Sequence, residues 1–273
     1  MGGDALRVLN LMSSVNTSQR VEAADPDIRV QDLGRMAYND AFNLQRRLQR
    51  ELIEQRREQS PAGTIHVLLV EHDPPVITVS RRKSAAGHLL ATDQQLQAAG
   101  VEVAETDRGG DITYHGPGQL VVYPILDLNL LGLRLHGYMR FLEDLIIDVL
   151  GRWGIGGVRD ECATGVWVNQ RGGAPPSRST CESNDTLNTA KICAMGVRVS
   201  RWVTMHGLAL NVTTNLDHFN LIVPCGLHGR TVTSMQQVLA EDCPSMDDVK
   251  DALIQSFETS VHECLSNSSN GAT

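Results

Sequence analysis

The sequence predicts an α+β fold in which helices pack on a mixed, mainly antiparallel sheet. Short apolar runs of strand length follow one another closely and are separated by turn residues, as in hairpins. Helical periodicity of apolar residues appears only near the start, the middle and the end of the chain. There is no sustained alternation of strands and helices of the kind that indicates a parallel sheet.

Length and composition limit the possible functions. With 273 residues, of which 41% are hydrophobic, the chain is long enough to bury a core. The net charge of −8 and the aromatic fraction of 4% disfavour a nucleic-acid partner. No apolar run approaches the roughly 18 residues of a membrane span, and the first residues lack a signal-peptide layout. We therefore expect a cytoplasmic protein with neither a nucleic-acid nor a membrane partner.

The first half of the chain predicts one helix followed by strands. Residues 1–26 are polar and predict a mobile N-terminal tail. Apolar residues recur every three or four positions over 33–52, which predicts an amphipathic helix ending before Pro61. Two buried strands at 64–71 and 76–80 follow, and the turn between them predicts a hairpin.

Residues 92–128 are predicted to form a short helix, a strand, a glycine-rich stretch and a second strand. Thr92 and Gln95 form a capping-box pattern that opens a short helix, and Gly100 ends it. A strand over 101–105 leads into a glycine-rich stretch. The strand after that stretch, 120–128, contains Pro124, which favours an edge or a bulge.

The second half is predicted as a helix over 138–150, strands and a final helix from Ser245. The strands are placed at 165–169, 191–199 and 203–212. We predict a single domain over 27–264 with a flexible insertion at 170–190, which is rich in Gly, Pro, Ser and Asn, and a C-terminal tail at 265–273.

The stretch 108–119 (RGGDITYHGPGQ) is the first candidate functional segment. It contains four glycines and a proline between two apolar runs. Glycines let a backbone approach a ligand closely and direct N–H groups toward it. We interpret the stretch as a binding loop across the mouth of a pocket. The alternative is an ordinary glycine-rich loop in which Tyr114 and His115 satisfy backbone groups.

Cys225 and Lys191 are the candidate reactive residues. Cys225 lies between a proline and a glycine, which suits a thiol presented on a loop, although a buried cysteine is the common alternative. A thiol with a pKa of about 8.5 is only slightly ionised at neutral pH, so a nucleophile needs a cationic or basic neighbour. Lys191 is one of three lysines and lies in an apolar strand, where a desolvated amine can transfer protons; a strand-end lysine reaching solvent is the alternative.

The cysteine pattern predicts neither disulfides nor a metal site. The six cysteines, with no close C-x-x-C pair, are at positions 162, 181, 193, 225, 243 and 264. In a chain of this size without a signal peptide, free thiols are expected. Cys225 and His228 have half of a zinc spacing, but the other half is missing, so we predict no metal.

Three segments resemble, in order, those of the lipoyl(octanoyl) transferases: RGGDITYHGPGQ at 108–119, KICAMG at 191–196 and PCG at 224–226. The resemblance covers about 32–261. It implies the catalytic fold of biotin and lipoate protein ligases and an acyltransferase activity without a cofactor. The donor would be octanoyl-acyl carrier protein. The acceptor would be a lysine of lipoyl domains, those of 2-oxoacid dehydrogenase E2 subunits and glycine cleavage H protein. Cys225 would form an acyl thioester, and Lys191 would lower its pKa.

The resemblance also implies the substrate-binding residues, which are Arg108, Gly109, Gly110, Asp111, Ile112, Thr113, Tyr114 and His115, then Ala194, Met195 and Gly196, then Gly207, Leu208 and Ala209. Small residues there suit an eight-carbon chain that threads between backbones. Cys193 and Met195 depart from the family pattern, and Cys193 is a rival thiol that we rank below Cys225. His115 and His206 either orient the reactants or are structural.

Several alternatives stay open. Three other functions are compatible with the sequence: an ATP-dependent lipoate or biotin ligase, a non-catalytic lipoyl-domain binding module, and a Cys–His hydrolase that uses Cys225 and His206. Since carrier proteins are acidic, the enzyme also needs a positive patch. The candidates for that patch are Arg81, Arg82 and Lys83 with Arg134, Arg198 or Arg201.

Overall fold

The computed structural model describes residues 25–57, 63–169, 189–224 and 229–270. In this part of the chain, one large sheet runs in the order β1 (Asp27–Met36), β2 (Thr64–His72), β6 (Gln119–Ile125), β10 (Val203–Asn211), β9 (Thr189–Ser200), β8 (Val166–Asn169) and β7 (Gly157–Arg159), with β11 (Thr231–Val232) beside β9. A smaller sheet has the order β4 (Glu102–Thr106), β3 (Val76–Ser80) and β5 (Ile112–His115). The β1–β2, β9–β11 and β3–β4 pairs are parallel and the other pairs are antiparallel, which confirms the predicted mixed, mainly antiparallel class.

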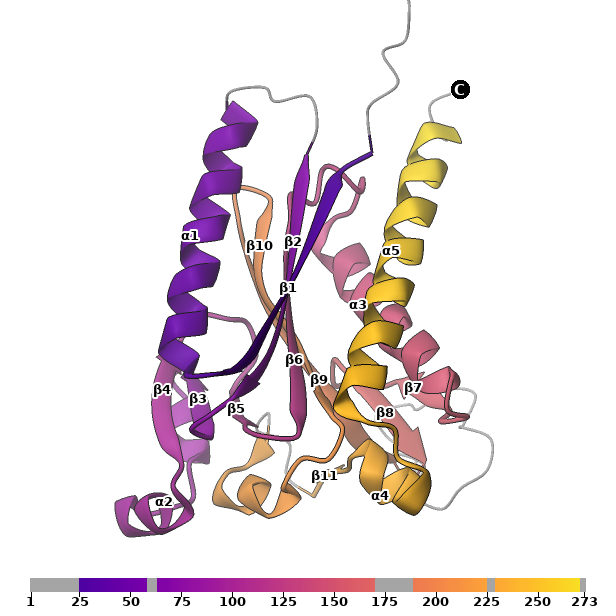
Figure 1. Ribbon diagram of the computed structural model, residues 1–273. Coiled ribbons are helices and arrows are strands. Elements are labelled where there is room, and N and C mark those ends of the chain that lie inside the picture. Colours follow the sequence, from indigo (N-terminus) through magenta and orange to yellow (C-terminus); the bar gives the residue numbers. More distant parts are fainter. Residues whose placement is uncertain (1–24, 58–62, 170–188, 225–228, 271–273) are drawn as a thin grey trace, which may run out of the picture.

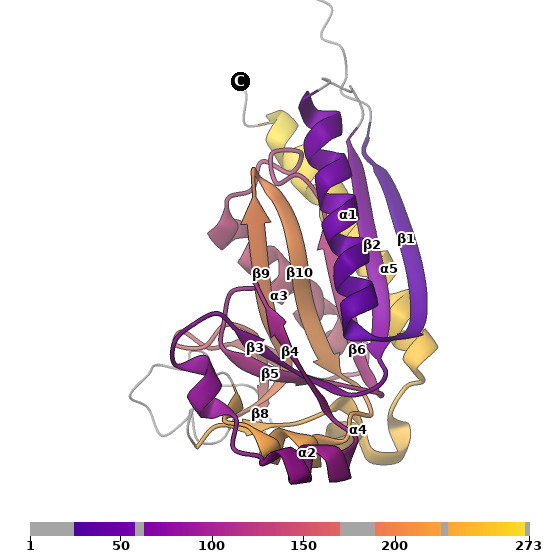
Figure 2. The same ribbon diagram turned by 90° about the vertical axis from the view of Figure 1, so that its left-hand side faces the viewer.

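Helices cover both faces of the large sheet (Figure 1). The helices are α1 (Tyr38–Arg57), α2 (Asp93–Ala99), α3 (Leu135–Gly151), α4 (Met235–Leu239) and α5 (Met246–Asn270). Because side chains alternate along a strand, Leu120 and Val122 of β6 pack with the core under α3 and α5, whereas Val121 and Tyr123 pack under α1. Figure 2 shows α1 lying over the strands, with the small sheet close to the end of α1 where that helix begins.

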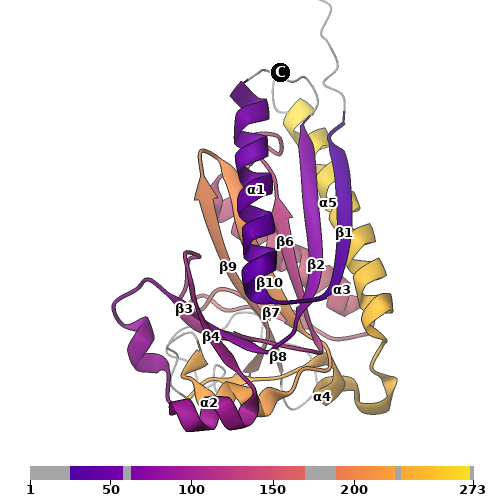
Figure 3. The ribbon, with the colours of Figure 1, turned by 60° about the vertical axis from the view of Figure 1, so that its left-hand side comes forward.

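The first strand corrects the predicted helix start. Residues 27–36 form β1, and α1 begins only at Tyr38. Leu33 and Met36 still pack against the core beneath α1, but they do so from a strand. β1 lies along the edge of β2 in a parallel register from Asp27 opposite Thr64. This long-range pairing outweighs the local helical periodicity, and it places β1 at the edge of the sheet, where β2 lies between it and α1 (Figure 3).

The predicted hairpin of 64–71 and 76–80 is also wrong. β2 pairs with β1 and β6, whereas β3 pairs with β4 and β5 in the other sheet. Both edges of β2 are therefore occupied. Pro74 and Pro75 between the strands carry no backbone N–H and cannot continue a ladder.

Pro124 lies in a central strand rather than at an edge. Antiparallel pairing of β10 with β6 stops at Val122, opposite Leu208. The hydroxyl of Thr204 then donates to the Pro124 carbonyl at 2.8 Å and accepts from the Leu126 N–H at 3.0 Å. A side-chain hydroxyl thus satisfies the backbone where the proline interrupts the ladder, and the expectation of an edge strand is wrong.

The caps predicted for α2 and the start predicted for the last helix agree with the structure. Thr92 and Gln95 form both bonds of a capping box, and Gly100 ends α2 with φ +62°. Ser245 caps α5 by accepting from the Asp248 N–H at 3.2 Å. α5 continues to Asn270, beyond the predicted boundary at 265. Of the predicted tails and insertion, 1–24, 170–188 and 271–273 lie outside the described residues. No helix in the described ranges has the length and apolarity needed to cross a bilayer.

Candidate active site

Lys191 lies in β9 and borders a cleft of about 1000 Å³. The residue is only 7% exposed, so its amine is held in a largely desolvated position. Nζ donates to the Thr164 carbonyl at 3.0 Å and lies 4.8 Å from the centre of the Trp167 ring. Ala163 and Met139 supply apolar parts of the same cleft. A carbonyl and an indole face both stabilise a cation, so the cleft holds Lys191 in a defined position.

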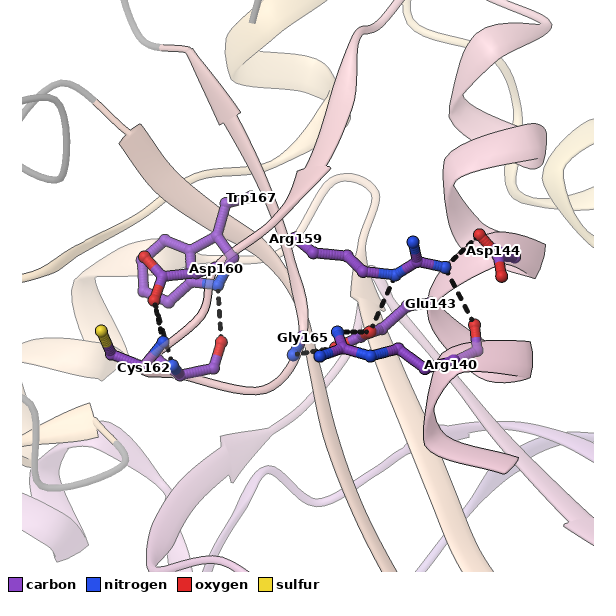
Figure 4. Close-up of polar contacts among 9 residues, drawn as sticks. Arg140, Glu143, Asp144, Arg159, Asp160, Cys162, Gly165 and Trp167 are labelled. Carbon is purple, nitrogen blue, oxygen red and sulfur yellow. Dashed lines mark hydrogen bonds and ion pairs between the residues drawn. The ribbon is translucent and has the colours of Figure 1, made fainter. Parts of the chain in front are cut away.

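The Thr164 carbonyl belongs to a short loop before β8, and hydrogen bonds between residues of this segment hold the loop in place (Figure 4). Asp160 accepts from the backbone N–H groups of Cys162 and Ala163 at 2.9 and 3.0 Å. Trp167 Nε1 donates to the Ala163 carbonyl at 3.0 Å. The Trp167 ring thus contacts the Lys191 amine and also anchors the loop that carries the Thr164 carbonyl, which accepts a hydrogen bond from that amine.

Glu143 of α3 fixes the other end of this loop. It is 1% exposed and accepts from the Gly165 N–H at 3.2 Å. Arg140 and Arg159 neutralise its carboxylate at 2.6 and 3.1 Å, and Arg159 also pairs with Asp144 (Figure 4). A buried carboxylate is tolerated because two guanidinium groups and one backbone donor satisfy it.

The start of the glycine-rich stretch packs directly on β9. The Gly109 N–H donates to the Val197 carbonyl at 2.9 Å. A Cβ on Gly196 would lie 2.7 Å from the Gly109 carbonyl oxygen, so this close approach requires glycine. Arg108 Nη2 donates to the Thr78 hydroxyl at 2.9 Å and to its carbonyl at 3.3 Å, which ties the stretch to β3.

The middle of the stretch is a strand, β5, rather than a loop. Because side chains alternate in a strand, Thr113 and His115 face a narrow cavity between the two sheets, and Asp111 just before β5 also lines it. Ile112 and Tyr114 point the other way, into a separate core with α2. Strand geometry thus divides residues that the sequence presents as one continuous motif.

The narrow cavity has about 490 Å³ of empty space, including the part that is open to solvent. The predicted binding residues that line it are Arg108, Gly110, Asp111, Thr113, His115, Ala194, Met195, Gly196, Gly207, Leu208 and Ala209. Gly110, Asp111, Met195 and Gly196 also line the Lys191 cleft, so the two spaces meet there. Gly109 lines the Lys191 cleft but not the narrow cavity. Ile112 and Tyr114 line neither of the two spaces.

The sequence did not identify Tyr38, Val121 or Tyr123 as binding residues, although all three line the narrow cavity. The chain has only four tyrosines, and two of them meet here. The small number of tyrosines was the one sequence feature that could have drawn attention to Tyr38 and Tyr123 as binding residues. Tyr38 comes from the start of α1 and Tyr123 from β6, so no local pattern connects them.

His206 also lines the narrow cavity, in a backbone conformation with φ +58°. Its Nε2 lies 2.8 Å from Asp107, and its backbone N–H donates to Gln45 at 2.9 Å. Burial lowers the pKa of His206, and the hydrogen bond from His206 lowers the pKa of Asp107, which also pairs with Arg198. His206 is therefore a neutral ring held in a fixed network.

His72 and His115 are buried side by side, with ring centres 5.7 Å apart. His72 contacts the Tyr123 hydroxyl at 2.7 Å and the Met36 carbonyl at 3.1 Å. Burial lowers the pKa of His72 to about 4 and places that of His115 well below its ordinary value. Both rings are therefore neutral at neutral pH.

Acid is expected to destabilise the protein through His72. From pH 6.5 down to about 4, the unfolded chain takes up a proton that folded His72 does not, so the free energy of unfolding falls by roughly 3 kcal/mol and then levels off. Above pH 6.5 this group contributes no pH dependence. Urea denaturation between pH 4 and 8 measures the slope. His72→Gln should reduce this slope, with buried His115 and His206 supplying the remainder, whereas exposed His136→Gln should leave it unchanged; an unchanged slope in His72→Gln would contradict the assignment.

The cysteines have different environments. Cys225 and the neighbouring residues 226–228 lie outside the described residues. Cys193 is free and fully buried, and burial raises the pKa of its thiol. Cys162 lines the Lys191 cleft and is disulfide-bonded, so the expectation of free thiols is wrong for this residue; sequence spacing does not report which cysteines approach in space. No group of three His, Cys, Asp or Glu side chains in the described ranges is arranged to hold a metal ion.

Comparisons with known proteins identify the family of this chain. Residues 37–258 match the lipoyl protein ligase A/B catalytic domain. An octanoyltransferase of Flavobacterium psychrophilum is 40% identical over 245 residues, which cover 87% of this chain and 97% of the relative. An octanoyltransferase of Chloroflexus aggregans is 45% identical over 231 residues, covering 84% and 93%.

Solved structures show the same fold. A chain from the structure of a bipartite lipoate protein ligase and its E2 lipoyl domain from Thermoplasma acidophilum aligns with a TM-score of 0.61 at 17% identity. The alignment covers 87% of this chain and 84% of that one. Because the family match spans residues 37–258 and relatives at 40–45% identity cover most of the chain, this chain belongs to the lipoyl protein ligase A/B catalytic-domain family.

Proposed function

We propose that this protein transfers an octanoyl group from octanoyl-acyl carrier protein to a lysine of a lipoyl domain. The observation that carries the proposal is a narrow cavity that shares Gly110 and Met195 as lining residues with the cleft of Lys191. An acyl tail in the cavity would direct its thioester carbonyl toward the amine. Burial of the tail contributes about 0.8 kcal/mol per methylene. The octanoyltransferase relatives support the same reaction.

In the first step, the Cys225 thiolate attacks the carbonyl carbon of the octanoyl thioester. A carbon–sulfur bond to Cys225 forms and the bond to the carrier sulfur breaks. The Lys191 ammonium gives its proton to the departing thiolate and becomes a neutral amine. The contacts from Thr164 and Trp167 hold that nitrogen in place during the transfer.

In the second step, the neutral amine of the acceptor lysine attacks the acyl-cysteine. The amide bond forms as the bond to the Cys225 sulfur breaks. Lys191 takes up the proton that the acceptor nitrogen loses, which restores the ammonium and the thiolate. Exchange between thioesters is nearly balanced, and amide formation drives the sequence forward without ATP.

The proposal is tested by incubating the purified protein with octanoyl carrier protein, with and without a lipoyl domain and ATP. We expect the enzyme to gain the mass of one octanoyl group without ATP and the lipoyl domain to gain it afterwards. Peptide mapping should place the enzyme adduct on Cys225. Transfer that occurs only with ATP and a free acid would favour a ligase. Release of free octanoate without an acceptor would favour a hydrolase.

A basic hollow that shares one lining residue with each of the two spaces fits the acidic donor. It is lined by Arg81, Arg82, Arg108 and Arg198 with Ser80 and Asp107, which gives it a positive balance of charge. Arg82 also lines the Lys191 cleft, and Arg108 also lines the narrow cavity. Arg134 and Arg201, two other candidates for the patch, lie elsewhere, near Trp202 and Arg56. We assign the docking of the carrier to this hollow.

Charge reversal in the basic hollow should weaken donor binding. Arg81→Glu with Arg82→Glu is expected to raise the KM for octanoyl carrier protein about tenfold at low salt, because attraction becomes repulsion. The difference from the wild type should shrink at high salt. Arg47→Glu with Arg50→Glu makes the same charge change on α1, at residues that line neither the hollow, the cavity nor the cleft, and should leave KM unchanged. Equal KM values for the two double variants would exclude docking at the hollow.

A further inference from the structure

The narrow cavity crosses two strand spacings of the large sheet. It begins at Met195 and Gly196 of β9, where it joins the Lys191 cleft, and reaches Val121 and Tyr123 of β6. β10 lies between these strands. Since neighbouring strands are about 4.8 Å apart, the two ends are separated by roughly 10 Å. The cavity therefore has a direction and a length measured from the reactive end.

A cluster of aromatic rings lies at the end of the cavity that is lined by β6. Tyr38, His115 and Tyr123 line the cavity, and all three pack against His72, which is fully buried behind them. The ring centres of Tyr38, His115 and Tyr123 lie 5.4, 5.7 and 6.0 Å from that of His72. We call these four residues the ring cluster.

Hydrogen bonds hold the ring cluster in place. His72 is bonded on both ring nitrogens, to the Tyr123 hydroxyl and the Met36 carbonyl. The Tyr38 hydroxyl donates to Thr106 at 2.9 Å. Displacing any of these rings would leave a buried polar group without its partner, so the end wall resists a longer ligand.

From this geometry we propose that the ring cluster sets the acyl-chain length, with Tyr38 as the specificity-determining side chain. The inference rests on the proposed octanoyl transfer and adds the basis of its chain-length selection. A straight acyl chain of eight carbons, with bonds of about 1.5 Å, extends roughly 9 Å, which matches the two strand spacings. Two further methylenes would meet the rings.

Tyr38→Ala should open the end of the cavity while the His72–Tyr123 bond remains. Ala209→Val, at a lining position partway along, should shorten the usable space. Phe42→Ala is the matched control, because Phe42 stacks on Tyr38 at 5.8 Å without lining the cavity. The measured quantity is kcat/KM with hexanoyl, octanoyl, decanoyl and dodecanoyl carrier protein, and each variant is checked for folding by circular dichroism.

The wild type should prefer octanoyl over dodecanoyl by about tenfold or more. Tyr38→Ala should raise the dodecanoyl-to-octanoyl ratio about tenfold, Ala209→Val should raise the hexanoyl-to-octanoyl ratio similarly, and Phe42→Ala should change neither. A folded Tyr38→Ala protein with the wild-type profile would overturn the inference. If that variant does not fold, an unchanged profile in Ala209→Val overturns it. A wild type that transfers no octanoyl group would instead refute the proposed function.

Discussion

A Lys191→Met protein is expected to fold and to lose about 10³-fold in kcat/KM for octanoyl transfer. Methionine fills a similar volume against Trp167 but neither gives nor accepts a proton. Lys191→Arg should lose nearly as much, because arginine keeps the positive charge but does not release its proton. Transfer to a lipoyl domain, followed by mass spectrometry over time, measures both variants. Together they separate proton transfer from simple charge stabilisation.

The chain provides a matched control for this test. Lys250 in α5 pairs with Asp32 at 2.8 Å on the surface, away from both spaces. Lys250→Met should therefore stay within about twofold of the wild-type activity. If Lys191→Met remained as active as Lys250→Met, the proton-transfer role of Lys191 would be excluded. If only Lys191→Arg were active, the amine would serve as a fixed charge.

Cys225→Ala is expected to abolish the acyl-enzyme and to reduce transfer by about 10⁴-fold or more, since no other thiol replaces the nucleophile. Intact mass measured after mixing with octanoyl carrier protein should show no adduct. Cys193 is the rival thiol in the sequence, but it is fully buried and burial raises the pKa of its thiol. Burial disfavours the thiolate that would attack the donor.

Cys193→Ala is the matched control. It removes one sulfur from the core, and we expect a small loss of stability together with a normal octanoyl adduct and normal transfer. The opposite pattern, an adduct retained in Cys225→Ala and lost in Cys193→Ala, would transfer the nucleophilic role to Cys193. An adduct retained in both variants would point to a different acyl acceptor. Peptide mapping of the remaining adduct would identify it.

The prediction from sequence was strongest where local chemistry decides the structure. The capping box at Thr92 and the glycine end at Gly100 were confirmed, and the last helix starts beside Ser245 as predicted. These features depend on residues only a few positions apart, so a single chain segment carries the necessary information. The apolar runs that became β2, β9 and β10 were recognised for the same reason.

The errors lie where distant segments compete for the same partners. Apolar residues do recur with a helical period from Leu33 onward. Residues 27–36 nevertheless form a strand, because their backbone pairs with the edge of β2. β2 and β3 separated because β1 and β6 occupied both edges of β2. Pro124 was expected to mark an edge or a bulge, and no local signal shows that its strand is central and that the Thr204 hydroxyl, 80 positions away, satisfies the neighbouring backbone groups. Non-local pairing thus overrides local preference.

The sequence by itself determined the α+β class, the family resemblance and the three segments that carry candidate binding residues. Only the tertiary structure decided which of those residues face the acyl cavity, since strand alternation turns Thr113 and His115 inward and Ile112 and Tyr114 outward. It also brought in Tyr38 and Tyr123, which no motif connects. A motif specifies chemistry along the chain, whereas the shape of a cavity arises from side chains that meet only when separate strands and helices pack together.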